Sequence, residues 1–163
     1  MIRPAVSGDE RAIAEVHVRT WQGAYRHVFP AEQLDAMSVE RRVEVWAEIL
    51  ADAELGVFVA EREGNVVGFS SVGASRDVGG EGELYGIYVL PAEWGSGAGG
   101  ALMEAALDAL RGYGYERATL WVLDDNPRAR AFYEKHGWRP DGETKRGTHL
   151  GVETDEVRYR VSL

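Results

Sequence analysis

The sequence predicts an α/β domain built around a mixed β-sheet. Three strand-like segments in the middle of the chain, residues 56–62, 66–75 and 84–90, follow one another without a helix between them. Helical periodicities separate the later strands instead, and this combination is typical of a mixed sheet. With 163 residues and 45% hydrophobic composition, the chain is long enough for a real core, and we expect one domain over residues 1–163.

The first third of the chain is predicted to be mainly helical. Residues 2–6 can form a short strand, and Ser7 stands three residues before Glu10, which is the spacing of a capping box at a helix start. Apolar residues then recur at helical intervals. Two further helices are expected at about 31–37 and 39–50.

The rest of the chain alternates strands and helices. Pro91 ends the central strand, and apolar residues at three- and four-residue intervals predict a helix that reaches Leu110. Asn126 and Pro127 have the residue types of a helix start. The remaining expected elements are a strand at 118–123, a helix from 127 to about 136, and strands at about 138–144 and 155–162. The predicted order is β-α-α-(α)-β-β-β-α-β-α-β-β.

A glycine cluster joins the central strand to the next helix. Gly95, Gly97, Gly99 and Gly100 allow sharp bends and a close approach to a ligand, while the N–H groups of the first helical turn point outward. No lysine or arginine lies between Pro91 and Leu110. A phosphate bound here would therefore be held by main-chain amides and the helix dipole.

Two kinds of phosphate site fit this cluster. Gly95, Gly97 and Gly100 match G-x-G-x-x-G, the dinucleotide fingerprint, which would indicate a nicotinamide-dependent oxidoreductase. That fingerprint normally opens a βαβ unit and is followed about twenty residues later by an acidic side chain. Asp124 comes late for that role, and more than eighty residues precede the loop, so the match is weak.

A second reading depends on two segments together. Trp94-Gly95-Ser96-Gly97-Ala98-Gly99 resembles the R/Q-x-x-G-x-G/A pyrophosphate loop of the GNAT N-acetyltransferase superfamily, although Trp94 replaces the usual Arg or Gln. The segment from Asn126 to Trp138 resembles the family's N-x-x-A-x-x-F-Y-x-k-x-G-F signature, with Trp138 in place of the final phenylalanine. Both segments stand in the family's order and separation, and the resemblance covers nearly the whole chain.

The resemblance implies the GNAT fold, with a mostly antiparallel central sheet, and acetyl-CoA as cosubstrate. A backbone N–H near Tyr88 and Val89 would polarise the thioester carbonyl, and the Tyr133 hydroxyl would protonate the departing thiolate. Gly86 inside the central strand suggests a bulge or a close backbone approach, which would splay the strand to admit pantetheine. The implied acetyl-CoA contacts are Ile87, Tyr88, Val89, Trp94, Gly95, Ser96, Gly97, Ala98, Gly99, Gly100, Asn126 and Tyr133.

The resemblance implies transfer of an acetyl group to a primary amine. No G-x-S-x-G motif and no cysteine is present, which favours direct attack by the amine over an acyl-enzyme. The general base is expected to be Glu83, with Glu81 or a water chain as open alternatives. Trp21 and Tyr25 are candidates to line the pocket of a small-molecule or peptide amine. A non-catalytic acyl-CoA-binding regulator is the alternative function.

The composition limits which kinds of partner the protein can be expected to bind. The net charge of −9 disfavours nucleic acid and anionic membranes and mildly favours a cationic substrate. The four histidines lack the spacing of ligand pairs, so no metal is expected. The N-terminal MIRPAVSGDE lacks the apolar segment of a signal peptide, and we expect a cytoplasmic protein. The family resemblance is compatible with a homodimer, which the sequence itself does not show.

Overall fold

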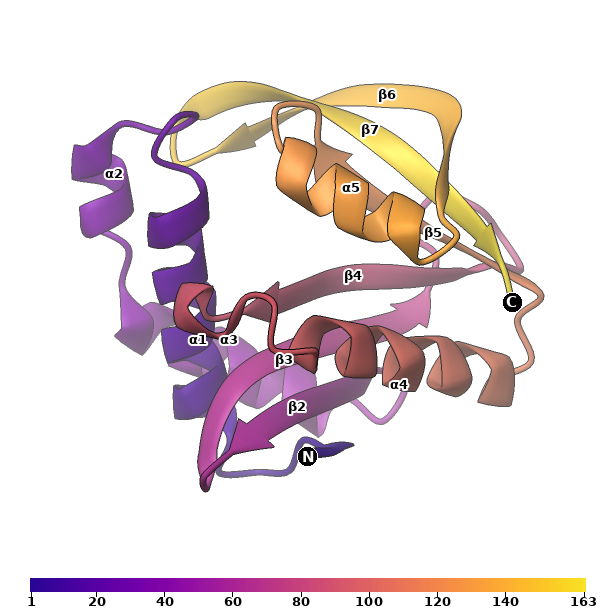
Figure 1. The fold of residues 1–163 in the computed structure, drawn as a ribbon, viewed down its shortest axis with the longest axis horizontal. Helices are drawn as coiled ribbons and strands as arrows, with labels where there is room; N and C mark the ends of the chain where they lie inside the picture. Colours follow the sequence, from indigo (N-terminus) through magenta and orange to yellow (C-terminus); the bar gives the residue numbers. More distant parts are fainter.

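Seven strands form one sheet in the computed structural model, which describes residues 1–163 (Figure 1). Their order across the sheet is β1-β2-β3-β4-β5-β7-β6. The strands are β1 (Ile2–Pro4), β2 (Gly56–Arg62), β3 (Asn65–Ala74), β4 (Gly82–Val89), β5 (Arg117–Leu123), β6 (Arg139–His149) and β7 (Val152–Ser162). The helices are α1 (Glu10–Ala24), α2 (Ala31–Asp35), α3 (Val39–Ala51), α4 (Ala98–Gly112) and α5 (Pro127–Lys135), and a short 3₁₀ turn, η1, covers Pro91–Glu93.

The sheet is antiparallel everywhere except between β4 and β5. Those two strands run parallel and pair only at Gly82 with Ala118 and at Glu83 with Thr119. Beyond Glu83 their paths separate, while β4 stays paired to β3 and β5 stays paired to β7. The sheet is therefore split along its middle, and the gap opens toward the ends of both strands.

Helices cover both faces of the sheet. Helices α1 and α3 pack on one face, where Ile13, Trp46 and Phe69 form part of a buried cluster with β2 and β3. Helix α4 packs on the other face, and Met103 and Leu110 meet residues of β4, β5 and β7 there. In Figure 1 the β6–β7 hairpin arches over α5, with α1 beside one end of the hairpin. None of the helices is long and apolar enough to cross a lipid bilayer.

The predicted element order and the mixed, mostly antiparallel sheet are confirmed. The last two strands are longer than predicted and form a hairpin of eleven residues on each side. The Ser7 capping box is wrong. Helix α1 begins after Asp9, whose carboxylate accepts hydrogen bonds from the Val6 N–H and from the Arg3 guanidinium. The arginine and the turn thus fix the helix start without the Ser7 hydroxyl.

A buried histidine lies where α1 packs on the sheet. His17 stacks on the ring of Tyr88 with 5.2 Å between centroids, and its Nδ1 accepts a hydrogen bond of 3.4 Å from the Trp46 indole. Burial, and secondarily the charge of Arg42, lowers the pKa of His17 from its ordinary 6.5 to about 3. His17 is therefore neutral in the folded protein at neutral pH.

Acid is expected to destabilise the fold through His17. In the unfolded chain the His17 side chain is protonated below pH 6.5. In the folded protein the same side chain stays neutral until about pH 3. Stability is thus lost as the pH falls through this window, by about 2 kcal/mol between pH 6.5 and about pH 5. His17→Phe should remove that part of the slope in urea unfolding, whereas His27→Phe at an exposed position should keep it. Equal slopes for wild type and His17→Phe would contradict the assignment.

Candidate active site

A large cleft occupies the gap between β4 and β5. Its volume is about 1000 Å³, and its lining comes from both splayed strands, the end of α1, the glycine loop, α5 and the β6–β7 hairpin. Segments far apart in the sequence therefore meet at one place. Clefts of this size at a break in a sheet are where proteins bind cosubstrates and substrates.

The splay has a local cause in β4. The register between β3 and β4 shifts by one residue, because Ser71 pairs with Gly86 and Val72 pairs with Leu84. Tyr85 is the extra residue of this bulge. At Gly86 a Cβ atom would stand 2.9 Å from the Tyr88 ring, so the close approach requires glycine. The bulge predicted at Gly86 is confirmed.

Beyond the bulge, β4 presents free backbone groups to the gap. The Leu90 N–H donates to Val67 of β3, so residues 88 and 90 point their amides toward β3. Successive residues of a strand alternate, and the N–H and C=O of Val89 therefore face the gap. The Trp94 indole donates a hydrogen bond of 2.8 Å to the Val89 carbonyl. This leaves the Val89 N–H at the splayed edge, where the sequence predicted a carbonyl-polarising amide.

The glycine loop forms one end of the cleft. Gly95 and Gly97 have φ of 82° and 93°, a region that favours glycine, and no atom lies within 4 Å of where a Cβ would stand. The open space beside both residues lets another molecule approach the backbone closely. Ser96 and Ala98 do not line the cleft, and the Ser96 hydroxyl accepts a hydrogen bond from the Ala98 N–H instead. The predicted residues that do line it are Trp94, Gly95, Gly97, Gly99 and Gly100.

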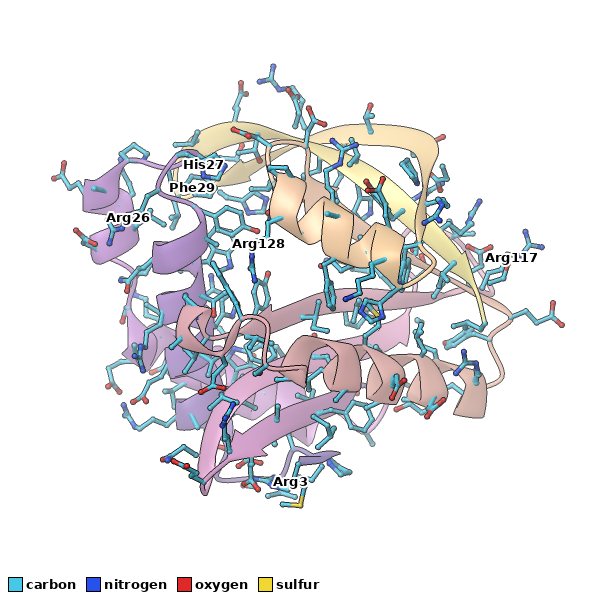
Figure 2. The ribbon with its side chains drawn as sticks, viewed as in Figure 1. Arg3, Arg26, His27, Phe29, Arg117 and Arg128 are labelled. Carbon is cyan, nitrogen blue, oxygen red and sulfur yellow. The ribbon has the colours of Figure 1, made fainter.

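A cation from another element lies over the loop. The Arg128 guanidinium stacks on the Trp94 ring, 3.2 Å from its centroid, and Figure 2 shows the side chain extending from α5 toward the loop. No carboxylate pairs with Arg128, and burial lowers its pKa. Arg130, by contrast, is held by Asp124 and by the Tyr159 hydroxyl. Of these two arginines, only Arg128 faces the cleft without a partner.

Asn126 joins α5 to the end of α1. Its Oδ1 caps the helix by accepting from the Ala129 N–H at 3.2 Å, and its Nδ2 donates to the Tyr25 hydroxyl at 3.1 Å. The capping bond and the bond to Tyr25 use different atoms of Asn126, and Asn126 lines the cleft. Asn126 thereby fixes the position of Tyr25, which burial alone would not do.

Tyr133 projects from α5 into the same cleft. Only 8% of the residue is exposed, and its ring packs near Trp138 and Tyr159. Burial is the main reason that the pKa of Tyr133 is raised well above its ordinary value, with smaller contributions from Tyr88 and Tyr25. The hydroxyl therefore keeps its proton at neutral pH and can only give that proton to a strongly basic atom.

Neither predicted carboxylate base points into the cleft. Glu83 is fully buried; one of its oxygens accepts from the Arg76 N–H, and the other accepts from the Arg76 guanidinium. Glu81 pairs with Arg160 at 3.1 Å. Glu83 also lies at the paired end of β4, before the strands separate. The geometry supports a structural ion pair for Glu83, and this argues against the role expected from the sequence.

A carboxylate that the sequence analysis missed lines the cleft instead. Glu156 lies on β7 opposite Leu123, with 12% of its side chain exposed. The predicted acceptor residues Trp21 and Tyr25 also line the cleft and pack edge to face, 4.8 Å apart. His149 lies 5.8 Å from Trp21 between ring centroids. No local motif marks Glu156, because only the pairing of β5 with β7 brings it here.

The split sheet, the glycine loop at its mouth and the buried tyrosine define a domain of the GNAT fold. The "Acetyltransferase (GNAT) family" profile matches residues 12–138. The uncharacterized N-acetyltransferase YuaI of Bacillus subtilis is 34% identical over 138 residues, which cover 83% of this chain and 78% of YuaI. An uncharacterized N-acetyltransferase of Mycobacterium tuberculosis is 36% identical over 119 residues, covering 71% of this chain and 72% of that protein.

The fold has a solved counterpart at low identity. The PaiA N-acetyltransferase of Thermoplasma acidophilum, crystallised with coenzyme A, superimposes with a TM-score of 0.83 at 17% identity, covering 100% of this chain and 98% of the other. The chain belongs to the acetyltransferase (GNAT) family. The dinucleotide reading of the glycine loop is therefore wrong, since the loop follows β4 of a mostly antiparallel sheet.

Proposed function

We propose that this protein is an N-acetyltransferase that moves the acetyl group of acetyl-CoA to a primary amine by direct attack. The single observation that supports this most is the buried, protonated Tyr133 in a cleft that also holds an open amide cradle. The names of the two N-acetyltransferase relatives and the coenzyme A of the Thermoplasma protein agree with it.

The residues present fit acetyl-CoA. A pyrophosphate requires close approach to several N–H groups, and the left-handed glycines of the loop leave that space open. The pantetheine arm would lie along the splayed edge of β4, where Ile87 and Val89 turn their backbone groups into the gap. Asn126 has one amide proton beyond the one given to Tyr25 and could donate it there.

The reaction would proceed through a ternary complex. The amine lone pair attacks the thioester carbonyl carbon, while the Val89 N–H stabilises the negative charge on the carbonyl oxygen. The C–N bond forms and the C–S bond breaks. Tyr133 gives its proton to the departing thiolate, and the proton that the nitrogen loses restores the phenol. The products are the acetylated amine and CoA with a free thiol.

Arg128 is proposed to bind a phosphate of the cosubstrate. It would supply a side-chain contact in place of the Arg or Gln of the family's loop pattern, a position that Trp94 occupies here. Arg128→Ala should raise the dissociation constant of acetyl-CoA about tenfold, as expected for loss of one charge-assisted hydrogen bond. Calorimetric titration measures this effect, and S-acetylpantetheine, which lacks the nucleotide phosphates, should bind both proteins equally.

A matched control separates this contact from the net charge of the protein. Arg117→Ala removes the same charge from an exposed residue at the far side of the molecule (Figure 2). Its acetyl-CoA affinity should equal that of wild type. Arg128 would not contact a phosphate of the cosubstrate if Arg128→Ala bound acetyl-CoA as tightly as wild type. The same conclusion would follow if the variant lost as much affinity for S-acetylpantetheine as for acetyl-CoA.

A further inference from the structure

Glu156 differs from every other carboxylate that the fold buries wholly or in part. Asp9 and Glu61 pair with Arg3, and Glu83 pairs with Arg76. The remaining four are also satisfied: Glu10 by the Gly8 N–H, Glu81 by Arg160, Glu93 by Arg62 and Asp141 by Arg158. Glu156 accepts no hydrogen bond, and its one ion-pair neighbour, His149 Nε2 at 3.7 Å, carries a charge only when it is protonated.

A carboxylate that accepts no hydrogen bond in a largely buried position is costly to the fold. Removing such a group from water without a donor is strongly unfavourable. Proteins retain such carboxylates at sites where a bound ligand supplies the missing partner. The Glu156 carboxylate faces the cleft, so a cationic ligand is the partner that its charge selects.

The other groups around Glu156 define what that ligand can be. Its charge raises the pKa of Tyr25 and of Tyr88, although burial is the larger cause for each. The same two tyrosines act electrostatically on Tyr133. Glu156, Tyr25, Tyr88 and the proposed acid Tyr133 all line the same cleft.

Cations on neighbouring strands do not neutralise Glu156. Lys145 stands opposite it on β6, but the Lys145 ammonium lies over the Trp121 ring, 4.2 Å from the centroid. Arg76 is held by Glu83. The rings of Trp21, Tyr25 and His149 line the same cleft as Glu156, and Trp21 packs against both of the other rings. Aromatic faces attract organic cations.

We infer that Glu156 is the acceptor site of this acetyltransferase: it binds the ammonium of a primary amine on an apolar or aromatic skeleton and takes its first proton. This inference rests on the proposed function and names its acceptor class. The ammonium would form an ion pair with Glu156, with its carbon skeleton against Trp21 and Tyr25. Transfer of one N–H proton to the carboxylate frees the lone pair, and attack then follows as described above. After the products leave, the Glu156 carboxyl gives this proton to solvent, which restores the carboxylate.

Direct binding tests the site without any acetyl transfer. Phenylethylamine and its uncharged counterpart 2-phenylethanol are titrated by calorimetry into wild type, Glu156→Gln and Glu153→Gln. Glu153 lies on the same strand with its side chain 72% exposed, and so provides a matched control. Wild type and Glu153→Gln should bind the amine at least about tenfold more tightly than the alcohol, and Glu156→Gln should lose that preference.

Turnover provides the second readout. With phenylethylamine as acceptor, Glu156→Gln should raise the amine KM and lower kcat about a hundredfold, with the acetyl-CoA KM unchanged and partial rescue in Glu156→Asp. Equal binding of amine and alcohol by wild type, or an unchanged preference in Glu156→Gln, overturns the Glu156 site. A Glu156-dependent preference without acetylation of any amine leaves the site standing and counts against the proposed function instead.

Discussion

Tyr133→Phe is expected to lower kcat for acetyl transfer about a hundredfold, with the acetyl-CoA dissociation constant unchanged. The phenyl ring keeps the contacts with Trp138 and Tyr159, so only the proton donor is removed. The raised pKa of Tyr133 means that the hydroxyl is fully protonated at neutral pH. The departing thiolate would then leave without a proton, which slows the breaking of the C–S bond.

Stopped-flow or steady-state release of the CoA thiol measures the Tyr133 effect. Tyr113→Phe is the control, because Tyr113 is 50% exposed and lies outside the cleft. That variant should retain wild-type turnover and the same thermal midpoint. If Tyr133→Phe turned over at the wild-type rate, Tyr133 would be a packing residue and the acid would have to be sought elsewhere.

Trp138→Ala is expected to reduce the free energy of unfolding by about 3–5 kcal/mol, the cost of truncating a large buried aromatic side chain. Trp138 has no exposed surface and lies in the cluster that joins α4, α5, β5 and β7. The backbone N–H of Trp138 donates to the Tyr133 carbonyl at 3.1 Å, and alanine at this position would keep that bond. The expected loss therefore comes from the core packing of the side chain.

Trp138→Phe is the more informative of the two variants. Most of the ring volume remains, and the buried Trp138 indole N–H, which has no hydrogen-bond partner, disappears. The loss should be below about 1.5 kcal/mol, as for other conservative core substitutions. Guanidinium unfolding of both variants measures the difference. Similar losses for Trp138→Phe and Trp138→Ala would show that packing at this site depends on the whole indole.

Much of the fold followed from local sequence patterns. Apolar alternation placed β2 and β3, Asn126 marked the start of α5, and Gly86 indicated the bulge that opens the sheet. Each of these features depends on residues close together in the chain, which a sequence displays directly. The lengths of β6 and β7 were underestimated, because their outer residues are polar and partly exposed and give no apolar alternation.

The parts of the site that depend on residues far apart in the sequence could not be predicted from the sequence. Glu83 resembled a base by position, but the loop after β3 brings Arg76 back onto it, and no strand pattern shows that return. Arg128 could not be told from its neighbouring cations until α5 was seen to place it over Trp94. Glu156 became visible only through the register of β7 against β5.

The most direct measurement is CoA release from acetyl-CoA by the wild-type protein against a panel of primary amines and short peptides. We expect thiol release with primary amines on apolar or aromatic skeletons, one acetyl group added per CoA released, and strongly reduced release in Tyr133→Phe. Tight acetyl-CoA binding with no release for any acceptor would contradict the catalytic account, and would favour a regulator that binds acyl-CoA without turning it over.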